Sequence, residues 1–302
     1  MARSRPECRP AARFANLRAM IPSSWRHAVR ACVLALAMLP LAACDRGPVE
    51  WTEGTSRQEL GDTTRPWRLT ANGVQRDVTQ DAVPPADYQG RACPGSLRIA
   101  VERDARGRTL AAAVWWSIRP DSSARLVSAM SADLGRTWSP PVMVDSLDRS
   151  GRGCARPAPA VAFESRSGYV HVAYFLEAVE GPGVFFAHSM DEGQLFHAPV
   201  PIVYGERPSR VAIAASGDTV VVVYEDPNAR QPAIGLALSR TQGHLFERKA
   251  ITASPPAAPA REPQVSIAGR TLQVAWVERP PGDAPPAIVV RRGEIREGAL
   301  GD

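Results

Sequence analysis

An arginine one or two residues before a proline stands ahead of three of the short apolar runs in this chain. These sites are Arg156-Pro157, Arg207-Pro208 and Arg261-Glu262-Pro263. A guanidinium group presents a planar fork of donors that binds a carboxylate bidentately. Acidic side chains follow other apolar runs, at Glu177, Glu225, Asp226 and Glu278. Gathered at one place, these arginines would suit an acidic sugar; paired with the acids, they would instead tie neighbouring segments together.

Short β-strands are the elements that must position these charges. From about residue 93, runs rich in Val, Ala and aromatics alternate with Gly, Pro, Asp and Ser turns, a pattern typical of antiparallel strands. Four units of strands are expected, with first strands at Leu97–Val101, Ala160–Phe163, Val211–Ala215 and Val265–Ala268. The second strands are expected at Leu110–Trp116, Val170–Phe175, Val220–Tyr224 and Leu272–Val277. Each second strand carries an aromatic residue (Trp115, Tyr174, Tyr224, Trp276) that we expect in the core.

An eight-residue motif follows the third strand of the first three units. It reads S-x-D-x-G-x-x-W in the first copy, where its defined positions are Ser131, Asp133, Gly135 and Trp138. The second copy keeps Ser189, Asp191, Gly193 and Phe196, and the third keeps Ser239, Gly243 and Phe246 without the Asp. Recurrence at about 50 residues indicates stacked units such as propeller blades. Because Ser and Asp side chains bind nearby backbone N–H groups in turns, we predict a structural role for the motif.

The three copies resemble the Asp-box, or bacterial neuraminidase repeat, of sialidase-like β-propellers. The resemblance covers roughly residues 93–293 and implies an all-β propeller of four-stranded antiparallel blades, with four recognisable units and room for a fifth. It also implies that the motifs lie on the face away from the binding site. The fourth unit stops at Gly293 without a fourth strand. We therefore expect an N-terminal strand, Pro66–Thr70, to close the ring and cover its open edge.

Sialidases of this fold use three arginines for the substrate carboxylate, a tyrosine nucleophile paired with a glutamate, and an aspartate acid/base. The resemblance therefore makes Tyr204, Glu206 and Asp226 catalytic candidates. Two departures weaken this interpretation: the family's Arg-Ile-Pro motif is missing, and the stretch after Cys93 is too short for six blades of about 50 residues each. We expect a non-catalytic propeller that binds a carbohydrate or an envelope protein. An exo-sialidase-type hydrolase of acidic sugars is the alternative, and an assembly scaffold is a third hypothesis.

The first 43 residues have the pattern of an export signal. Arg26 and Arg30 precede the apolar run 31–39, which is too short to span a bilayer. The following Leu41-Ala42-Ala43-Cys44 resembles a bacterial lipobox, which implies lipidation of Cys44 and a place in the cell envelope, periplasmic or on the outer surface. An ordinary signal peptide with a chance cysteine is the alternative. Because the region before the apolar run is long, Met20 is an alternative start.

These patterns divide the chain into a signal (1–43), a lipidated N-terminus with a tether and closing strand (44–92), a propeller (93–293) and a tail (294–302). Seven arginines in the signal account for the formal net charge of +5, and the rest is close to neutral. We therefore expect no nucleic-acid partner. The expected partners are the membrane, through the lipid, and a carbohydrate or envelope protein.

Cysteine and histidine usage limits the remaining chemistry. Once Cys8 and Cys32 leave with the signal and Cys44 carries lipid, Cys93 and Cys154 remain as a pair. Export favours a disulfide between them, the alternative being two separate buried thiols. The histidines outside the signal lack zinc-ligand spacing, and the chain has no CxxC, P-loop or dinucleotide fingerprint. No metal or cofactor is expected.

Overall fold

The computed structural model describes residues 47–62, 65–77, 82–148, 153–251 and 258–297. The predicted signal, the alternative start at Met20 and the lipidation site Cys44 lie outside these ranges, as do the last residues of the predicted tail. Residues 47–297 belong to one compact unit that begins at Gly47.

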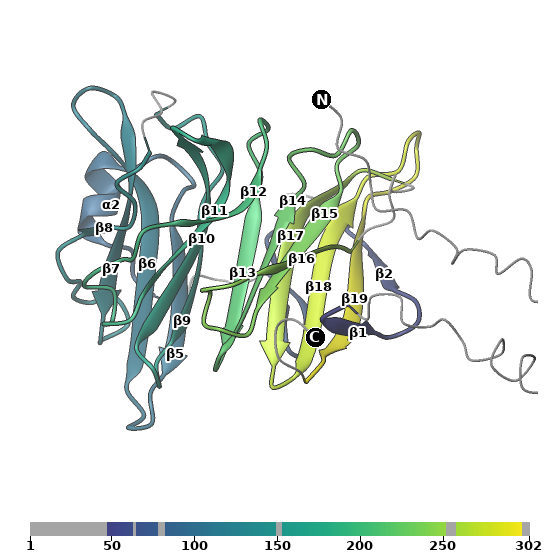
Figure 1. The fold of residues 1–302 in the computed structure, drawn as a ribbon, viewed down its shortest axis with the longest axis horizontal. Coiled ribbons are helices and arrows are strands. Elements are labelled where there is room, and N and C mark those ends of the chain that lie inside the picture. The colour runs from purple at the N-terminus through teal and green to yellow at the C-terminus, as the bar shows by residue number, and fades with distance from the viewer. Residues whose placement is uncertain (1–46, 63–64, 78–81, 149–152, 252–257, 298–302) are drawn as a thin grey trace, which may run out of the picture. The chain divides into compact units, whose positions relative to one another are not determined.

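The described residues form an all-β propeller built from antiparallel sheets (Figure 1). Sheet 1 contains β5 (Arg98–Arg103), β6 (Thr109–Ile118), β7 (Ala124–Ser131) and β8 (Val142–Met143). Sheet 2 contains β9 (Ala160–Glu164), β10 (Tyr169–Ala178), β11 (Gly181–Ser189) and β12 (Val200–Tyr204). Sheet 3 contains β13 (Val211–Ser216), β14 (Thr219–Glu225), β15 (Ile234–Ser239) and β16 (Glu247–Ala250). Each predicted first and second strand overlaps an observed one.

Sheet 4 is completed from the N-terminal region, but not by the segment we expected. Its own strands are β17 (Ala260–Ala268), β18 (Thr271–Glu278) and β19 (Ala287–Ile295). Two N-terminal strands, β1 (Val49–Trp51) and β2 (Ser56–Glu59), each pair with β19. β1 pairs with the last residues of β19, and β2 pairs with its first residues. The prediction that Pro66–Thr70 pairs with this sheet is wrong, because β3 (Trp67–Thr70) forms its own hairpin with β4 (Gly73–Arg76).

The β3–β4 hairpin is a fifth, two-stranded sheet that docks on sheet 4. The Gln264 side chain of β17 accepts the Leu69 N–H at 2.7 Å and donates to the Trp67 carbonyl at 2.9 Å. A single amide thus satisfies both backbone groups on one edge of β3. The first part of 44–92 was expected to be a tether, but β1 to β4 show that its described residues from Val49 to Arg76 contain folded strands.

The segment between the hairpin and sheet 1 carries α2 (Ala86–Arg91). Tyr88 on this helix packs against the Trp115 cluster of sheet 1. No described helix is long and apolar enough to cross a membrane.

The core lies between successive sheets and is built mainly by the second strands. The predicted core aromatics are confirmed, with Trp115, Tyr174, Tyr224 and Trp276 all 5% exposed or less. Trp116 and Tyr174 join sheets 1 and 2, and Phe186 with Val222 joins sheets 2 and 3. Side chains alternate between the two faces of a strand, so the second strand of a blade packs against both neighbours.

The three repeated motifs form equivalent turns after β7, β11 and β15. In each, the serine Oγ accepts the N–H of the motif glycine, at 2.8 Å for Ser131–Gly135 and 2.9 Å for both Ser189–Gly193 and Ser239–Gly243. Asp133 accepts the Thr137 N–H at 2.8 Å, and Asp191 accepts the Leu195 N–H at 2.9 Å. In the third copy the Thr241 hydroxyl accepts the Leu245 N–H at 2.9 Å, at the position of the missing aspartate.

Hydrogen bonds within the turns favour the charged form of the two aspartates. The backbone N–H of Thr137 lowers the pKa of Asp133, and the Ser189 hydroxyl lowers the pKa of Asp191. Each carboxylate is used within its own turn, as the sequence predicted. We call the end of the sheets that carries these turns the motif-turn end.

Candidate functional site

The opposite end of the sheets, where the first strands begin, contains a depression of about 580 Å³. We call this depression the mouth. Antiparallel pairing places it there, because Val211 at the start of β13 pairs with Tyr224 near the end of β14. The loops that enter β9 and β13 surround it, together with the start of β17 and the ends of β14 and β18. Its lining residues are Ala155, Arg156, Pro157, Pro208, Arg210, Glu225, Arg261, Glu262 and Arg279.

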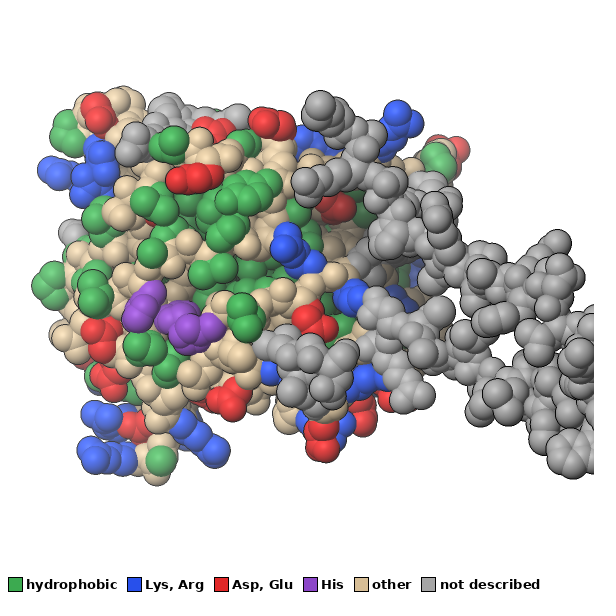
Figure 2. All heavy atoms as spheres, in the orientation of Figure 1, with side chains coloured by type: hydrophobic (Ala, Val, Ile, Leu, Met, Phe, Trp, Pro, Cys, Tyr) green, Lys and Arg blue, Asp and Glu red, His purple; other side chains and the backbone are tan. Residues whose placement is uncertain are grey.

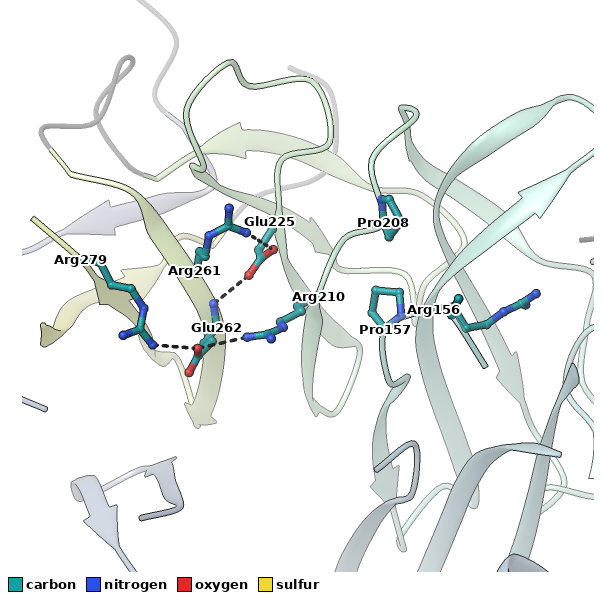
Figure 3. A pocket seen from close by; sticks show the side chains of 9 residues that line it. Arg156, Pro157, Pro208, Arg210, Glu225, Arg261, Glu262 and Arg279 are labelled. Carbon is teal, nitrogen blue, oxygen red and sulfur yellow. Dashed lines mark hydrogen bonds and ion pairs between the residues drawn. The ribbon is translucent and has the colours of Figure 1, made fainter. Parts of the chain in front are cut away.

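Glu225 is the most deeply placed acid of the mouth. Its carboxylate accepts the backbone N–H of Glu262 at 3.0 Å and lies 3.6 Å from the Arg261 guanidinium (Figure 3). The Glu225 side chain is only 11% exposed, whereas that of Arg261 is 49% exposed. Glu262 adopts a left-handed conformation, with φ of 57°, at the register shift that separates Arg261 from Gln264. Glu225 therefore links sheet 3 to an irregular part of sheet 4.

Glu262 gathers two further arginines. Its carboxylate lies 3.1 Å from the Arg210 guanidinium and 3.4 Å from that of Arg279 (Figure 3). Both guanidinium groups are about half exposed. Three guanidinium groups thus share two carboxylates, leaving an excess of positive charge. Because exposed ion pairs contribute little free energy, these forks can exchange partners with an incoming anion.

Arg156, the first predicted ligand-binding arginine, lines the mouth but is directed away from this network (Figure 3). Its guanidinium pairs with Asp148, and both side chains are almost fully buried. It also lies 4.4 Å from the centre of the Trp116 ring. These contacts make Arg156 part of the packing between sheets 1 and 2.

Arg207, the second predicted arginine, is not one of the described residues that line the mouth. Its Nε donates to the Pro227 carbonyl at 3.0 Å, and its Nη2 donates to the Ala229 carbonyl. The side chain therefore fastens its own loop to the loop after β14. Of the three predicted arginines, only Arg261 contacts a carboxylate in the mouth.

The predicted acids also separate. Glu225 lines the mouth, and Glu177 lies near the end of β10, outside the lining residues. Glu278 accepts hydrogen bonds from Arg57 of β2 at 2.6 Å and from the Trp276 indole at 3.1 Å. Asp226 accepts the Asn228 N–H at 2.9 Å within a turn. Of the four predicted acids, Glu225 and Glu278 pair with arginines, so our second interpretation, pairing between the charges, applies to these two.

The three catalytic candidates are not brought together. Tyr204 ends the outer strand β12, where its ring packs edge-on against Phe185. Of the described residues, neither Tyr204, Glu206 nor Asp226 lines the mouth. Within the same part of the chain, no hydrogen bond or ion pair joins any two of their side chains.

Arg210 and Arg279 line the mouth but were not among the ligand-binding residues predicted from the sequence. Both are adjacent to strand ends, since β13 begins at Val211 and β18 ends at Glu278. Correct strand boundaries would therefore have predicted that both arginines lie at this end of the sheets. The Arg-Pro pattern selected Arg207 instead.

Below the mouth a larger channel of about 1000 Å³ runs between the first strands and β3. It shares Pro157, Arg210 and Glu262 with the mouth. Arg98 and the aromatic residues Trp67 and Tyr88 also line it. The channel wall therefore adds a further guanidinium group and two aromatic rings to the charges at the mouth.

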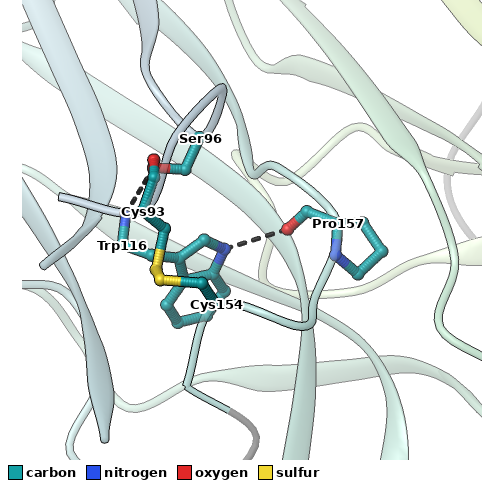
Figure 4. Close-up of a disulfide and its surroundings, with 5 residues drawn as sticks. All are labelled: Cys93, Ser96, Trp116, Cys154 and Pro157. Atoms are coloured by element: carbon teal, nitrogen blue, oxygen red, sulfur yellow. Dashed lines mark hydrogen bonds between the residues drawn. A yellow bond between two sulfur atoms is a disulfide. The ribbon is translucent and has the colours of Figure 1, made fainter. Parts of the chain in front are cut away.

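A disulfide supports one side of the mouth. Cys93 and Cys154 are bonded, with their Cα atoms 5.2 Å apart, so the predicted pairing is confirmed (Figure 4). The Trp116 indole donates to the Pro157 carbonyl at 2.9 Å, and the Cys93 N–H donates to the Trp116 carbonyl at 2.9 Å. The loop that enters sheet 2 is thus held to sheet 1 by one covalent bond and one hydrogen bond.

A buried acid lies beside this support. Asp145 is 4% exposed, and burial raises its pKa to about 6. Burial likewise raises the pKa of Tyr174 well above its ordinary value. Both groups are enclosed by packing, so they influence stability more directly than they influence a ligand.

All four histidines outside the predicted signal gather between sheets 2 and 3. The His188 ring lies 4.9 Å from that of His197, 5.0 Å from His244 and 6.3 Å from His171, measured between ring centres. Burial lowers the pKa of His171 to about 3 and that of His188 to about 4. Among the described residues, no group of three or more His, Cys, Asp or Glu side chains could hold a metal ion.

No protein-family model matches the chain, and no curated protein matches its sequence. Among solved structures, it is similar to a protein of unknown function from Dyadobacter fermentans DSM 18053, at 19% identity over 76% of this chain and 67% of that one, with a TM-score of 0.51. Hadza microbial sialidase Hz136 matches 72% of this chain at 17% identity and a TM-score of 0.47. The chain spans half the length of that sialidase. At these identities the first similarity shows the fold alone, and the second carries no functional argument.

Proposed function

We propose that this protein is an exported lipoprotein whose propeller binds an acidic carbohydrate at the mouth without hydrolysing it. The observation that carries the proposal is the sharing of Glu225 and Glu262 by Arg210, Arg261 and Arg279. The acids hold the arginines in place, and the guanidinium groups remain about half exposed. A ligand carboxylate can bind these forks bidentately, whereas a neutral sugar cannot.

The proposal includes the identity of the repeated turns and of the anchor. We assign the three motif turns as Asp-boxes, because their serine, aspartate and glycine positions share one pattern of hydrogen bonds. We assign Cys44 as the lipidated residue from the lipobox-like sequence before it. Together these assignments describe a propeller held in the bacterial cell envelope.

Binding is favoured over hydrolysis by the position of the catalytic candidates. A nucleophile and its base must lie within hydrogen-bond reach of each other and of the substrate. Tyr204 packs on Phe185 at the outer strand, and Asp226 is engaged in a turn. A sialidase mechanism therefore lacks its reacting pair at the mouth.

Binding to immobilised sialic acid, glucuronate and galacturonate oligosaccharides tests the proposal, with the corresponding methyl esters as neutral ligands. We expect binding of at least one acidic sugar and loss of binding on esterification. The Arg210→Ala and Arg279→Ala variants should each weaken binding by roughly tenfold, the value of one charged hydrogen-bonding group. Arg166→Ala is the matched control, because Arg166 is exposed in the β9–β10 turn at the opposite end of the sheets.

Two results would contradict the proposal. Failure to bind any carboxylated sugar, with retention of an envelope protein in a pull-down, would favour a protein partner at this mouth. Turnover of a fluorogenic sialoside that is lost in Arg210→Ala would show that the protein is an enzyme.

A further inference from the structure

The folded chain begins at the motif-turn end of the propeller. Val49 on β1 pairs with Ile295, the last residue of β19. The Pro48 carbonyl accepts the Arg296 N–H at 3.0 Å and lies 3.4 Å from the guanidinium of Arg240. Arg240 belongs to the third motif turn. The point at which the chain enters the propeller is therefore in contact with one of these turns.

The distance from this entry point to the proposed lipid is short. Only three peptide links separate Cys44 from Gly47. Since consecutive Cα atoms are about 3.8 Å apart, the Cα atoms of Cys44 and Gly47 are at most about 11 Å apart, whatever the conformation between them. A lipid on Cys44 would thus keep the entry point close to the bilayer surface.

The motif-turn end also exposes apolar side chains. It carries five of the nine large apolar side chains that are exposed among the described residues: Val83, Leu134, Met190, Leu195 and Leu245. Leu195 and Leu245 occupy the same position of the second and third turns and are 66% and 61% exposed. Figure 2 shows the surface histidines of this region grouped together, with apolar and acidic side chains beside them. Exposed leucines suit the boundary between headgroups and acyl chains.

We propose that the motif-turn end is a membrane-facing surface, which the lipid anchor holds against the bilayer, so that the mouth points away from the membrane that anchors it. The proposal rests on the lipid anchor of the proposed function. A strand of seven residues such as β14 separates the two ends by about 20 Å. The ligand of the mouth is consequently a molecule of the aqueous compartment or of a facing surface, and not a headgroup of the same bilayer.

Energy transfer from the lipidated mature protein, without residues 1–43, to a headgroup-labelled acceptor in phosphatidylethanolamine/phosphatidylglycerol vesicles tests this orientation. The donor is attached to one introduced thiol, in Leu245→Cys at the motif-turn end or in Val179→Cys at the mouth end. The two sites are matched, since Leu245 is 61% and Val179 67% exposed. With Cys93 and Cys154 bonded and Cys44 acylated, the introduced thiol is the reactive one. We expect about twofold greater transfer from position 245, given a separation of about 20 Å.

A variant with a flexible Gly/Ser linker of about 20 residues between Arg46 and Gly47 tests the cause. If the short connection sets the orientation, the linker should reduce the difference between the two positions to less than half. Equal transfer from both positions, or greater transfer from position 179, in vesicle-bound protein without the linker would overturn the orientation and leave the anchor intact. Failure of the protein to associate with vesicles would overturn the anchor and the orientation together. Sugar binding at the mouth is measured separately and depends on neither result.

Discussion

The carboxylate of Glu225 accepts the backbone N–H of Glu262 at 3.0 Å and thereby joins the end of β14 to the irregular start of β17. Glu225 is 8% exposed, so loss of its carboxylate leaves a poorly solvated N–H without an acceptor. We expect Glu225→Ala to lower the free energy of unfolding by about 1–3 kcal/mol. Glu225→Gln keeps an acceptor oxygen and should cost less. Urea unfolding of the two variants measures the difference, and equal losses would contradict the role assigned to this hydrogen bond.

Arg156 and Arg279 both line the mouth, but their substitution should affect different properties. The Arg156–Asp148 pair is almost fully buried, so Arg156→Ala leaves a buried charge without this partner. We expect a loss of about 3–5 kcal/mol in the free energy of unfolding. Arg279 is 45% exposed, and Arg279→Ala should change stability by less than about 1 kcal/mol while weakening sugar binding. Thermal unfolding and binding assays on the same two variants check this division; an Arg156→Ala protein of unchanged stability would refute it.

The disulfide should supply a large share of the stability of sheets 1 and 2. Cys93 and Cys154 are 61 residues apart, and closing a loop of that length stabilises a fold by about 4 kcal/mol. The Cys93→Ser/Cys154→Ser protein should therefore unfold at markedly lower urea concentration than the oxidised protein. Reduction of the native protein should produce the same shift. If reduction leaves the urea midpoint unchanged, the bond contributes little to the fold.

The buried histidines predict acid sensitivity. Burial holds the folded pKa of His171 at about 3 and that of His188 at about 4, below the ordinary value near 6.5. Between the folded pKa values and about pH 6.5, the unfolded chain therefore binds more protons than the folded chain. The contribution of the two neutral histidines to stability is fully present above about pH 6.5 and is lost as the pH falls toward their folded pKa values. By pH 4, His171 should account for a loss on the order of 3 kcal/mol, and His188 for less because its ring adjoins the exposed His197 and His244.

Unfolding by urea at pH 7.5, 6, 5 and 4 measures this effect. His171→Leu removes the proton acceptor while keeping an apolar side chain between Tyr169 and Phe186, and should flatten the pH dependence. His197→Gln is the comparison variant: His197 is exposed, so its removal should alter the pH profile only through the neighbouring His188. No carboxylate is among the groups that shift the pKa of either buried ring, so only neighbouring histidines oppose protonation electrostatically. An unchanged pH profile in His171→Leu would contradict the assignment.

Much of the fold was predictable from local pattern. A near-continuous run of apolar and aromatic residues marks a strand buried on both faces, as in the stretch from Val170 to Leu176 on β10. The motif turns were predictable because their hydrogen bonds lie within eight residues of the chain. The Gly135 N–H donates to Ser131, and the Thr137 N–H donates to Asp133. The disulfide followed from the even number of cysteines left in a chain that we expect to be exported. Each of these inferences depends on neighbours in sequence or on composition.

The site was predictable only in part, because its contacts join different sheets. An Arg-Pro pair places an arginine before a first strand but does not determine the direction of the side chain. Arg261 meets Glu225 across two sheets, whereas Arg207 turns to the carbonyls of Pro227 and Ala229 and Arg156 is buried with Asp148. Arg210 and Arg279 enter the mouth because first strands begin and second strands end there, in neighbouring blades.

The sequence by itself thus determined the strands, the motif turns and the cysteine pair. Runs of apolar residues specify the strands, short-range hydrogen bonds specify the turns, and composition specifies the pair. Tertiary structure alone decided which N-terminal strands complete sheet 4 and which arginines share Glu225 and Glu262. Strand segments such as 49–51 and 67–70 have similar local preferences, and only the free edge of β19 selects between them. The physical reason is that an open edge and a buried carboxylate are satisfied by groups far away in sequence, whose approach depends on the packing of the whole propeller.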